Sequence, residues 1–188
     1  RLCSSAASDV YKRQTSDKIH MLDRYGREVE KFPISIKKST DIGHSLFDYN
    51  KSKRYRIMVA ERDNSITNLD RKGKKVIGWK YQKNNKIIKE LKHFKVGDKD
   101  YIAKVSKKEI ELLAINGSSR LKFKSSGNIM IQNEIILDKN RNLLFINSAN
   151  KLLICNLDGN SSEISIESLD TSSCLLYTSP SPRDLRAS

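Results

Sequence analysis

The chain repeats one short pattern four times, and this repeat limits the folds it can adopt more than any other feature. In each copy an apolar residue is followed seven positions later by a glycine, and the copies are spaced by 47, 44 and 42 residues. Self-similarity at a nearly fixed period is typical of a repeat architecture in which each copy is one supersecondary unit. The copies run from Ile19, Ile66, Ile110 and Leu152 to Gly26, Gly73, Gly117 and Gly159.

Each unit divides into up to four short apolar stretches separated by polar turns. Such stretches, bounded by Asn, Asp and Gly, are strand and hairpin signals, and four strands in about 40 to 50 residues are typical of a β-propeller blade. We therefore predict an all-β chain, a partial β-propeller of about 3.5 four-stranded antiparallel blades. The units are placed at residues 15–38, 42–82, 86–124 and 128–169.

The second unit shows the layout best, and the other units are fitted to it. Its strands are expected at Ser45–Tyr49, Tyr55–Ala60, Ser65–Leu69 and Lys75–Tyr81. Strands such as Leu143–Ile146 are apolar at nearly every position, as expected where both faces of a sheet are covered. Further strands are expected at Ile19–Leu22, Glu28–Ile36, Leu91–Phe94, Tyr101–Val105, Ile110–Ile115, Arg120–Lys124, Ile129–Ile131, Glu134–Leu137, Asn142–Asn147, Leu152–Leu157 and Glu163–Ile166.

A helix competes with a strand at one place. Apolar residues at Ile87, Ile88, Leu91 and Phe94 follow helical spacing. The repeat register instead aligns Leu91–Phe94 with the first strand of the second unit. Since four aligned copies of the repeat outweigh helical spacing in one short stretch, the sequence favours a strand.

The candidate special residues are structural and belong to the repeated turns. Gly26, Gly73, Gly117 and Gly159 are predicted to supply the positive φ of a tight turn. Aspartates in the same turns are expected to bond backbone N–H groups with their own side chains. These aspartates are Asp23, Asp70 and Asp158.

Both ends of the chain look like a translated sequencing adapter of the transposase type. Codons that give Asp9–Gln14 have a reverse complement that encodes Cys174–Ser179, so opposite strands of one oligonucleotide account for the two ends. We interpret residues 1–14 and 174–188 as artefact and exclude them from fold reasoning. Residues 15–173 are then expected to be a fragment of a longer chain.

Composition leaves one alternative function open. The formal net charge is +14, from 36 Lys and Arg against 22 Asp and Glu. A basic balance suits nucleic acid or an anionic surface. The lysines are spread through every unit rather than gathered on one, so a basic nucleic-acid-binding surface is kept only as a second alternative.

No residue pattern predicts a catalytic, cofactor or metal site. The three histidines, His20, His44 and His93, lie in different units without ligand spacing. Cys155 stands in an apolar stretch and is expected to be an inert buried thiol. Asp48, Asn50 and Ser52 match the start of a calcium loop, but basic residues lie among them and no acidic residue completes the set.

The repeat motif resembles bacterial propellers of the pyrroloquinoline-quinone-like and WD-repeat-like kind. The motif reads apolar-x-apolar-Leu-Asp-x-x-Gly-x-x-Val and is followed by Phe32-Pro33 or Gly78-Trp79. More narrowly, Leu46–Asn50, Tyr55–Ala60 and His93–Ile102 look like the C-terminal propeller of large uncharacterised bacterial proteins. These proteins are exported or membrane-anchored, which favours the cell envelope or periplasm by resemblance alone.

The resemblance implies a non-enzymatic interaction or scaffold module. Its partner would be a protein or cell-envelope component, together with the remaining blades of the same chain. The alternative is a fragment of a quinoprotein-type, cofactor-binding enzyme. In such enzymes a Trp follows the repeat glycine at a fixed spacing, and Trp79, the only Trp in the chain, departs from it.

Overall fold

The computed structural model describes residues 11–14, 17–23, 25–38, 40–49, 54–130 and 134–166. These residues form strands and turns and contain no helix, so none of them makes a helical segment that could cross a bilayer. The chain divides into two compact units, Arg1–Lys122 and Phe123–Ser188. Each unit is described separately below.

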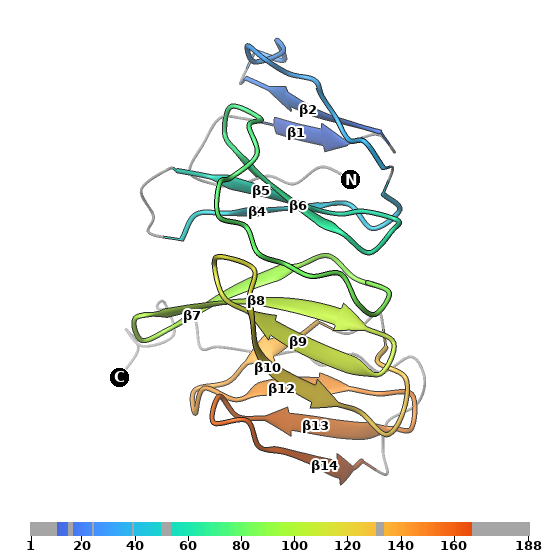
Figure 1. The fold of residues 1–188 in the computed structure, drawn as a ribbon. Coiled ribbons are helices and arrows are strands. Elements are labelled where there is room, and N and C mark those ends of the chain that lie inside the picture. Colours follow the sequence, from blue (N-terminus) through green and yellow to red (C-terminus); the bar gives the residue numbers. More distant parts are fainter. Residues whose placement is uncertain are drawn as a thin grey trace, which may run out of the picture. The chain divides into compact units, whose positions relative to one another are not determined.

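The strands form four antiparallel sheets in which sequence neighbours are also spatial neighbours (Figure 1). The first sheet contains β1 (Tyr11–Gln14), β2 (Lys18–Leu22) and β3 (Ile34–Ser35), and the second contains β4 (His44–Phe47), β5 (Arg56–Ala60) and β6 (Ile66–Asp70). The third sheet contains β7 (Lys92–Val96), β8 (Lys99–Ser106), β9 (Glu109–Leu113) and β10 (Ser119–Lys124). The fourth contains β11 (Ile136–Leu137), β12 (Leu143–Ile146), β13 (Lys151–Cys155) and β14 (Ser161–Ser165).

The second sheet is covered on both faces, and β5 shows why its sequence is continuously apolar. Successive side chains of a strand point to opposite faces. Ile57 and Val59 pack with residues of the first sheet. Met58 and Ala60 pack instead with residues of the third sheet. Within residues 1–122, neighbouring sheets therefore stack face to face, each with its own shared apolar core.

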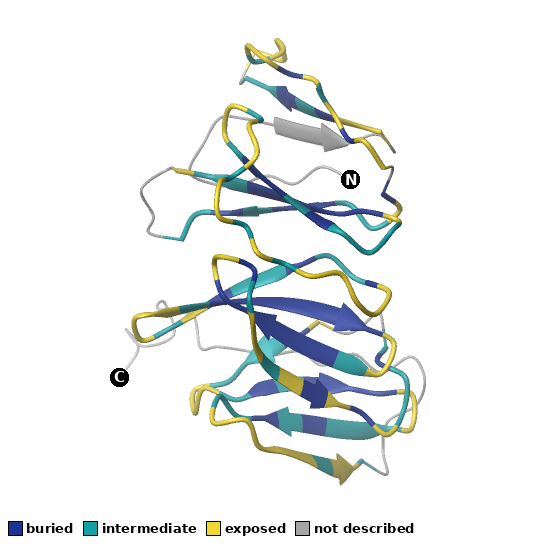
Figure 2. Ribbon diagram, viewed as in Figure 1, coloured by how far each residue is buried: buried dark blue, intermediate teal, exposed yellow. Residues whose placement is uncertain are grey.

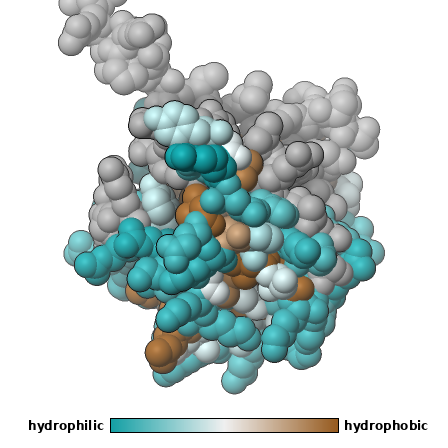
Figure 3. Space-filling view, turned by 90° about the horizontal axis from the view of Figure 1, so that it is seen from above, coloured by the Kyte–Doolittle hydropathy of each residue, from teal (hydrophilic) through white to brown (hydrophobic). Residues whose placement is uncertain are grey.

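The burial of side chains differs strongly between strands (Figure 2). Tyr101–Ser106 of β8 is buried at every position, whereas β14 is largely exposed. Among the residues coloured in Figure 3, hydrophilic ones predominate, with smaller hydrophobic areas among them. The apolar residues of the predicted strands thus supply the core, as their pattern indicates.

The expected strand at Leu91–Phe94 is confirmed, and the helical alternative is wrong. Residues Lys92–Val96 form β7, which pairs with β8 through the register Phe94↔Tyr101. Leu91 and Ile87 are buried in the core shared by the second and third sheets. Their spacing reflects burial in that core rather than helical periodicity.

Four expected strands are reduced to single bridges or two-residue strands. Lys75–Tyr81 makes only the bridge Lys75↔Leu69, because the chain then turns at Ile77–Gly78 and leaves the sheet. In Glu28–Ile36, only the bridge Glu28↔Leu22 and β3 remain, because Lys31 has a positive φ of 74° and interrupts the extended backbone. In the fourth sheet, Ile129 makes one bridge with Asn147 and the strand expected at Glu134–Leu137 is β11 alone. Residue 131 lies outside the described residues.

One strand falls within the residues interpreted as adapter. The backbone of β1 pairs with β2 in the register Tyr11↔Leu22 to Gln14↔Ile19. Backbone pairing does not bear on how a segment is encoded, so the adapter origin of residues 1–14 stays a prediction. Residues 174–188 lie outside the described residues.

Candidate functional site

One five-residue turn recurs seven times in the described residues. Its first residue donates its N–H to the carbonyl of the fifth, and the fourth donates its N–H to the carbonyl of the first, at N···O distances of 2.8–3.2 Å. The fourth residue has a φ between 53° and 99°. This is the three-residue hairpin loop that ends in a left-handed residue. The turns span residues 23–27, 61–65, 70–74, 114–118, 138–142, 147–151 and 156–160.

The structure places the four repeat glycines at the left-handed position of their turns. Gly26, Gly73, Gly117 and Gly159 have φ values of 77°, 76°, 85° and 99°. Three further turns have no glycine at this position, so the repeated glycine does not mark them, although the sequence indicates turns at Asp63-Asn64 and at Asp138–Arg141. Their left-handed residues are Asn64, Arg141 and Asn150.

Two of the three aspartates bond their own turns as expected. Asp23 Oδ1 accepts the N–H groups of residues 25 and 27, and Asp70 Oδ1 accepts those of residues 72 and 74, at 2.8–3.0 Å. In the fourth copy this role belongs to Asn156, whose Oδ1 accepts the N–H of Asp158 at 3.1 Å and that of Asn160 at 2.9 Å. The expectation for Asp158 is wrong because this aspartate is the third residue of its turn, whereas the bonding side chain belongs to the first.

Trp79 joins the segment after the second sheet to a turn of the third sheet. Its indole Nε1 donates to the carbonyl of Ile66 at 2.8 Å, and the next residue, Lys80, donates its N–H to the carbonyl of Asn116 at 2.7 Å. A Cβ on Gly117 would lie 3.0 Å from the indole ring and 2.8 Å from the backbone nitrogen of Tyr81. Gly117 therefore provides space for this docking as well as the turn conformation.

A hollow of about 400 Å³ adjoins the docked indole. We call it the Trp79 hollow. Ile77, which is 99% exposed, and Ile115, which is 49% exposed, form part of its lining. Its lining residues are Tyr49, Arg54, Arg56, Val76, Ile77, Gly78, Trp79, Asp100, Ile115 and Asn116. They come from the second sheet, the third sheet and the segment between them, so sequence reasoning did not bring them together.

The hollow has an excess of positive charge. Arg54 and Arg56 both line it, and no ion pair found in the described residues involves either guanidinium. The single lining carboxylate, Asp100, is bonded to His93 Nε2 at 2.7 Å. The hydroxyl of Tyr49 is buried and has no hydrogen-bond partner among the described residues, and burial raises the pKa of this phenol. A buried hydroxyl without a partner is a group that a ligand can satisfy.

A buried polar cluster lies apart from the hollow, on the face of the third sheet. Lys104 of β8 is fully buried, and its Nζ contacts Glu111 Oε2 of β9 at 2.6 Å. The same Nζ donates to Asn84 Oδ1, and Asn84 Nδ2 donates to Glu111 Oε2 at 3.0 Å. Burial of Glu111 raises its pKa, but hydrogen bonds from Lys104, Asn84 and Ser119 outweigh that effect and lower the pKa to about 2. The carboxylate is therefore ionised at neutral pH.

Comparisons with known proteins identify the architecture. No family model matches the sequence, and no curated protein matches it either. Several solved structures match at low identity. They include BBS1N in complex with ARL6DN, at 14% identity and a TM-score of 0.60, covering 83% of this chain and 48% of that chain. They also include BamB from Moraxella catarrhalis, at 16% identity and a TM-score of 0.60, covering 88% and 53%.

A third match is a catalytically inactive virginiamycin B lyase from Staphylococcus aureus with quinupristin, at 14% identity and a TM-score of 0.58, covering 89% of this chain and 55% of that chain. The chain spans about half the length of these structures. It has a β-propeller fold. The predicted fold class is confirmed, and each sheet is a propeller blade of three or four described strands. A protein complex and a lyase both occur among the matches, so the propeller alone does not choose between binding and catalysis.

The remaining sequence candidates take structural places in the blades. His20 bonds Glu28 at 2.6 Å, and His93 packs against the ring of Tyr49 at 4.9 Å. The described residues contain no group of three His, Cys, Asp or Glu side chains arranged to hold a metal. Cys155 is buried, and burial raises the pKa of its thiol to about 12. Asn50 and Ser52, which match part of a calcium loop in the sequence, lie outside the described residues.

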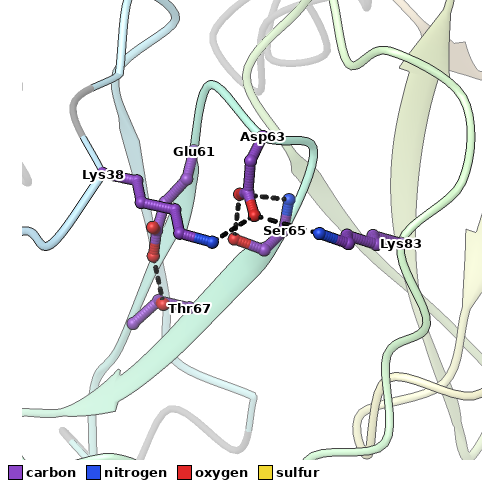
Figure 4. Close-up of polar contacts among 6 residues, drawn as sticks. All are labelled: Lys38, Glu61, Asp63, Ser65, Thr67 and Lys83. Carbon is purple, nitrogen blue, oxygen red and sulfur yellow. Dashed lines mark hydrogen bonds and ion pairs between the residues drawn. The ribbon is translucent and has the colours of Figure 1, made fainter.

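Asp63 connects the second blade to the chain segments on both of its sides (Figure 4). Lys38, before the second blade, and Lys83, after it, both bond Asp63 Oδ2, the latter at 3.3 Å. Asp63 Oδ1 accepts the Ser65 hydroxyl at 2.5 Å and the Ser65 N–H at 3.1 Å. The hydrogen bond from Lys38, followed by those from Ser65 and Lys83, holds the pKa of this carboxyl well below its usual range.

Asp63→Asn is expected to lower the melting temperature at pH 7 and to have a smaller effect at pH 3. A carboxyl whose pKa is lowered by folding adds stability above its unfolded pKa, and this stability is lost as the pH falls below about 4. Thermal melts of both proteins at the two pH values test this. Asp98→Asn, in the exposed turn between β7 and β8, is the control and should leave the melting temperature unchanged at both pH values. A gap between Asp63→Asn and the unmodified chain that stays constant with pH would contradict the prediction.

Proposed function

We propose that this propeller is a non-enzymatic protein-interaction module. The Trp79 hollow is its binding site and receives a segment of a protein partner that carries an apolar side chain beside an acidic one. The observation that carries the proposal is the full exposure of Ile77 next to a half-buried tryptophan in a hollow. The envelope location implied by the resemblance would make the partner a cell-envelope component.

The apolar part of the hollow supports a protein ligand. Single exposed apolar residues are ordinary on protein surfaces. Here Ile77 and Ile115 line the same hollow as Trp79, and that combination resembles the centre of an interface, where aromatic residues and arginine are enriched. Trp79 is fixed by its bond to Ile66, so binding requires little ordering of this side chain.

The charged part of the hollow supports an acidic ligand. Arg54 and Arg56 offer guanidinium groups, which bind carboxylates with two parallel hydrogen bonds. Asp100 opposes a negative ligand, but one of its oxygens is already held by His93. Two cationic groups against one carboxylate that is already hydrogen-bonded favour an anionic group on the ligand.

Nucleic acid is the competing partner class for a basic hollow. Phosphate contacts suit Arg54 and Arg56, and Trp79 offers a stacking surface. The two exposed isoleucines favour a protein, because an apolar residue at the rim gains nothing from a phosphate backbone. A steep dependence of binding on salt concentration would mark the nucleic-acid class.

Selection from a random peptide library tests the proposal, because Trp79 is the single tryptophan and its emission reports binding. We expect the chain to enrich peptides that combine apolar and acidic residues. Tryptophan-free versions of these peptides should shift the Trp79 emission saturably. Replacing the acidic residue by its amide should weaken binding about tenfold, equivalent to about 1.4 kcal/mol.

Ile77→Asp is the matched variant, because a fully exposed position tolerates a charge without loss of folding. It should abolish the emission shift. Enrichment of the same peptides by Ile77→Asp would contradict the proposal. A shift produced only by single-stranded DNA, and lost at moderate salt, would assign the hollow to nucleic acid instead.

A further inference from the structure

A fully buried lysine that touches a side-chain amide calls for an explanation. Burying an ion pair removes two charges from water, and its attraction often only balances that cost, so stability alone does not account for Lys104 and Glu111. Lys104 is also the largest of the fully buried side chains. The residue that completes its surroundings is Asn84, whose amide lies in the segment between the second and third blades.

The orientation of the Asn84 amide is set by its two neighbours. Its oxygen accepts from the Lys104 ammonium, and its nitrogen donates to Glu111 Oε2. A carbonyl accepts and an NH₂ donates, so the opposite orientation would lose both bonds. The lysine nitrogen therefore contacts the carbonyl oxygen of the amide, and this oxygen is bonded to Cγ, the carbon that an amine would attack.

One oxygen of Glu111 touches both nitrogens. Oε2 lies 2.6 Å from Lys104 Nζ and 3.0 Å from Asn84 Nδ2. A group that moves a proton between two atoms must lie within hydrogen-bond reach of both. Glu111 meets this condition for a proton that leaves the lysine and arrives at the amide nitrogen.

The surroundings of Lys104 exclude water from its nitrogen. The Lys104 side chain has no exposed surface, Glu111 is 3% exposed, and the Tyr81 ring lies 5.7 Å from Nζ. A desolvated lysine amine is an effective nucleophile. Holding it against its target replaces an encounter in solution by a reaction within one molecule, which is a large advantage for a slow step.

From this arrangement we propose that Lys104 and Asn84 react to form an intramolecular amide cross-link, with Glu111 as the proton carrier. The Lys104 ammonium passes one proton to Glu111, and the resulting amine lone pair forms a bond to Asn84 Cγ while the π electron pair of the C=O bond moves onto Oδ1. A second proton moves from the lysine nitrogen to Nδ2. The electron pair on Oδ1 then re-forms the C=O bond, and the Cγ–Nδ2 bond breaks with its electron pair on nitrogen. The released ammonia takes the proton from Glu111 and leaves as ammonium.

The products balance the reactants, and no oxidant or other reactant is needed. One C–N bond forms and one breaks, and Glu111 returns to its carboxylate form. The cross-link joins the segment after the second blade to the central strand β8 of the third blade. It is independent of the proposed ligand site, because none of the three reacting residues lines the Trp79 hollow.

Intact mass of the soluble, folded chain tests the proposal. We expect a mass lower than the sequence mass by one ammonia, about 17 Da. Trypsin should fail to cut after Lys104, and a branched peptide should join residues 84–86 to residues 100–107. Glu111→Gln and Asn84→Ala should both show the full sequence mass, with trypsin cutting after Lys104. A circular dichroism spectrum that matches that of the chain without substitutions confirms that these variants are folded.

Asn85→Ala is the matched control, because Asn85 bonds Glu109 instead and should not affect the cross-link. The full sequence mass and normal cleavage after Lys104 in the folded chain without substitutions would overturn the proposal. So would a deficit accompanied by normal cleavage, which indicates cyclisation of an asparagine on its own backbone. An undiminished cross-link in Glu111→Gln would remove Glu111 from the reaction and overturn the proposed mechanism.

Discussion

Ile57→Ala is expected to lower the free energy of unfolding by about 2–5 kcal/mol. Ile57 has no exposed surface and packs between the first and second blades, where its removal takes away apolar contacts and leaves a cavity. Urea unfolding followed by Trp79 emission measures the loss. The effect should be large because backbone hydrogen bonds between strands hold both sheets in place. The sheets therefore have little freedom to close the cavity that the smaller side chain leaves.

Ile77→Ala is the control for that measurement. It makes the same chemical change at a position that is 99% exposed, and its effect should stay within about 0.5 kcal/mol. Equal losses in the two variants would mean that the stacking of the first and second blades does not stabilise the chain. A loss confined to Ile57→Ala would locate the stability in the core between them.

Gly117→Ala is expected to destabilise the chain by about 2–5 kcal/mol, from two separate causes. The first is backbone strain, since an alanine at a φ of 85° is unfavourable by about 1–2 kcal/mol. The second is overlap, since the new Cβ would lie 2.8 Å from the Tyr81 nitrogen and 3.0 Å from the Trp79 ring. Because one of these neighbours is backbone, a side-chain movement alone does not relieve the overlap.

Gly26→Ala separates the two causes. Gly26 has the same place in the same turn and a φ of 77°, but a Cβ there would meet no atom within 4 Å. It should show the strain alone, about 1–2 kcal/mol. Gly117→Ala should in addition shift the Trp79 emission. Equal stabilities and unchanged emission would show that the indole is not docked on this turn.

Local patterns in the sequence were enough to predict the blades. Glycine spacing set the register, and this register outweighed the helical spacing around Leu91, where a strand is found. The prediction failed at Lys75–Tyr81, because the chain leaves the sheet so that Trp79 reaches the turn of the next blade. A contact between two repeats decides that conformation, and no property of residues 75–81 alone signals it.

The Trp79 hollow and the buried cluster of Lys104, Glu111 and Asn84 differ in how far they could be predicted from the sequence. The Trp79 hollow gathers residues from three distant segments, so their meeting depends on how blades pack. The Lys104–Glu111 pair was within reach of sequence reasoning. Lys104 interrupts the apolar run of β8, and a tight turn at Lys107–Lys108 places it opposite Glu111 in the hairpin register. Asn84 is distant in sequence from β8, and no local pattern connects it to that hairpin.

The recurring five-residue turn has a consequence for how far such chains drift apart during evolution. Its left-handed position is occupied by glycine, asparagine or arginine in different copies, so hydrogen bonding alone preserves the turn. Glycine is compulsory only where a neighbouring repeat presses against it, as at Gly117. We therefore expect the contact points to vary least among related chains and the rest of each repeat to vary most.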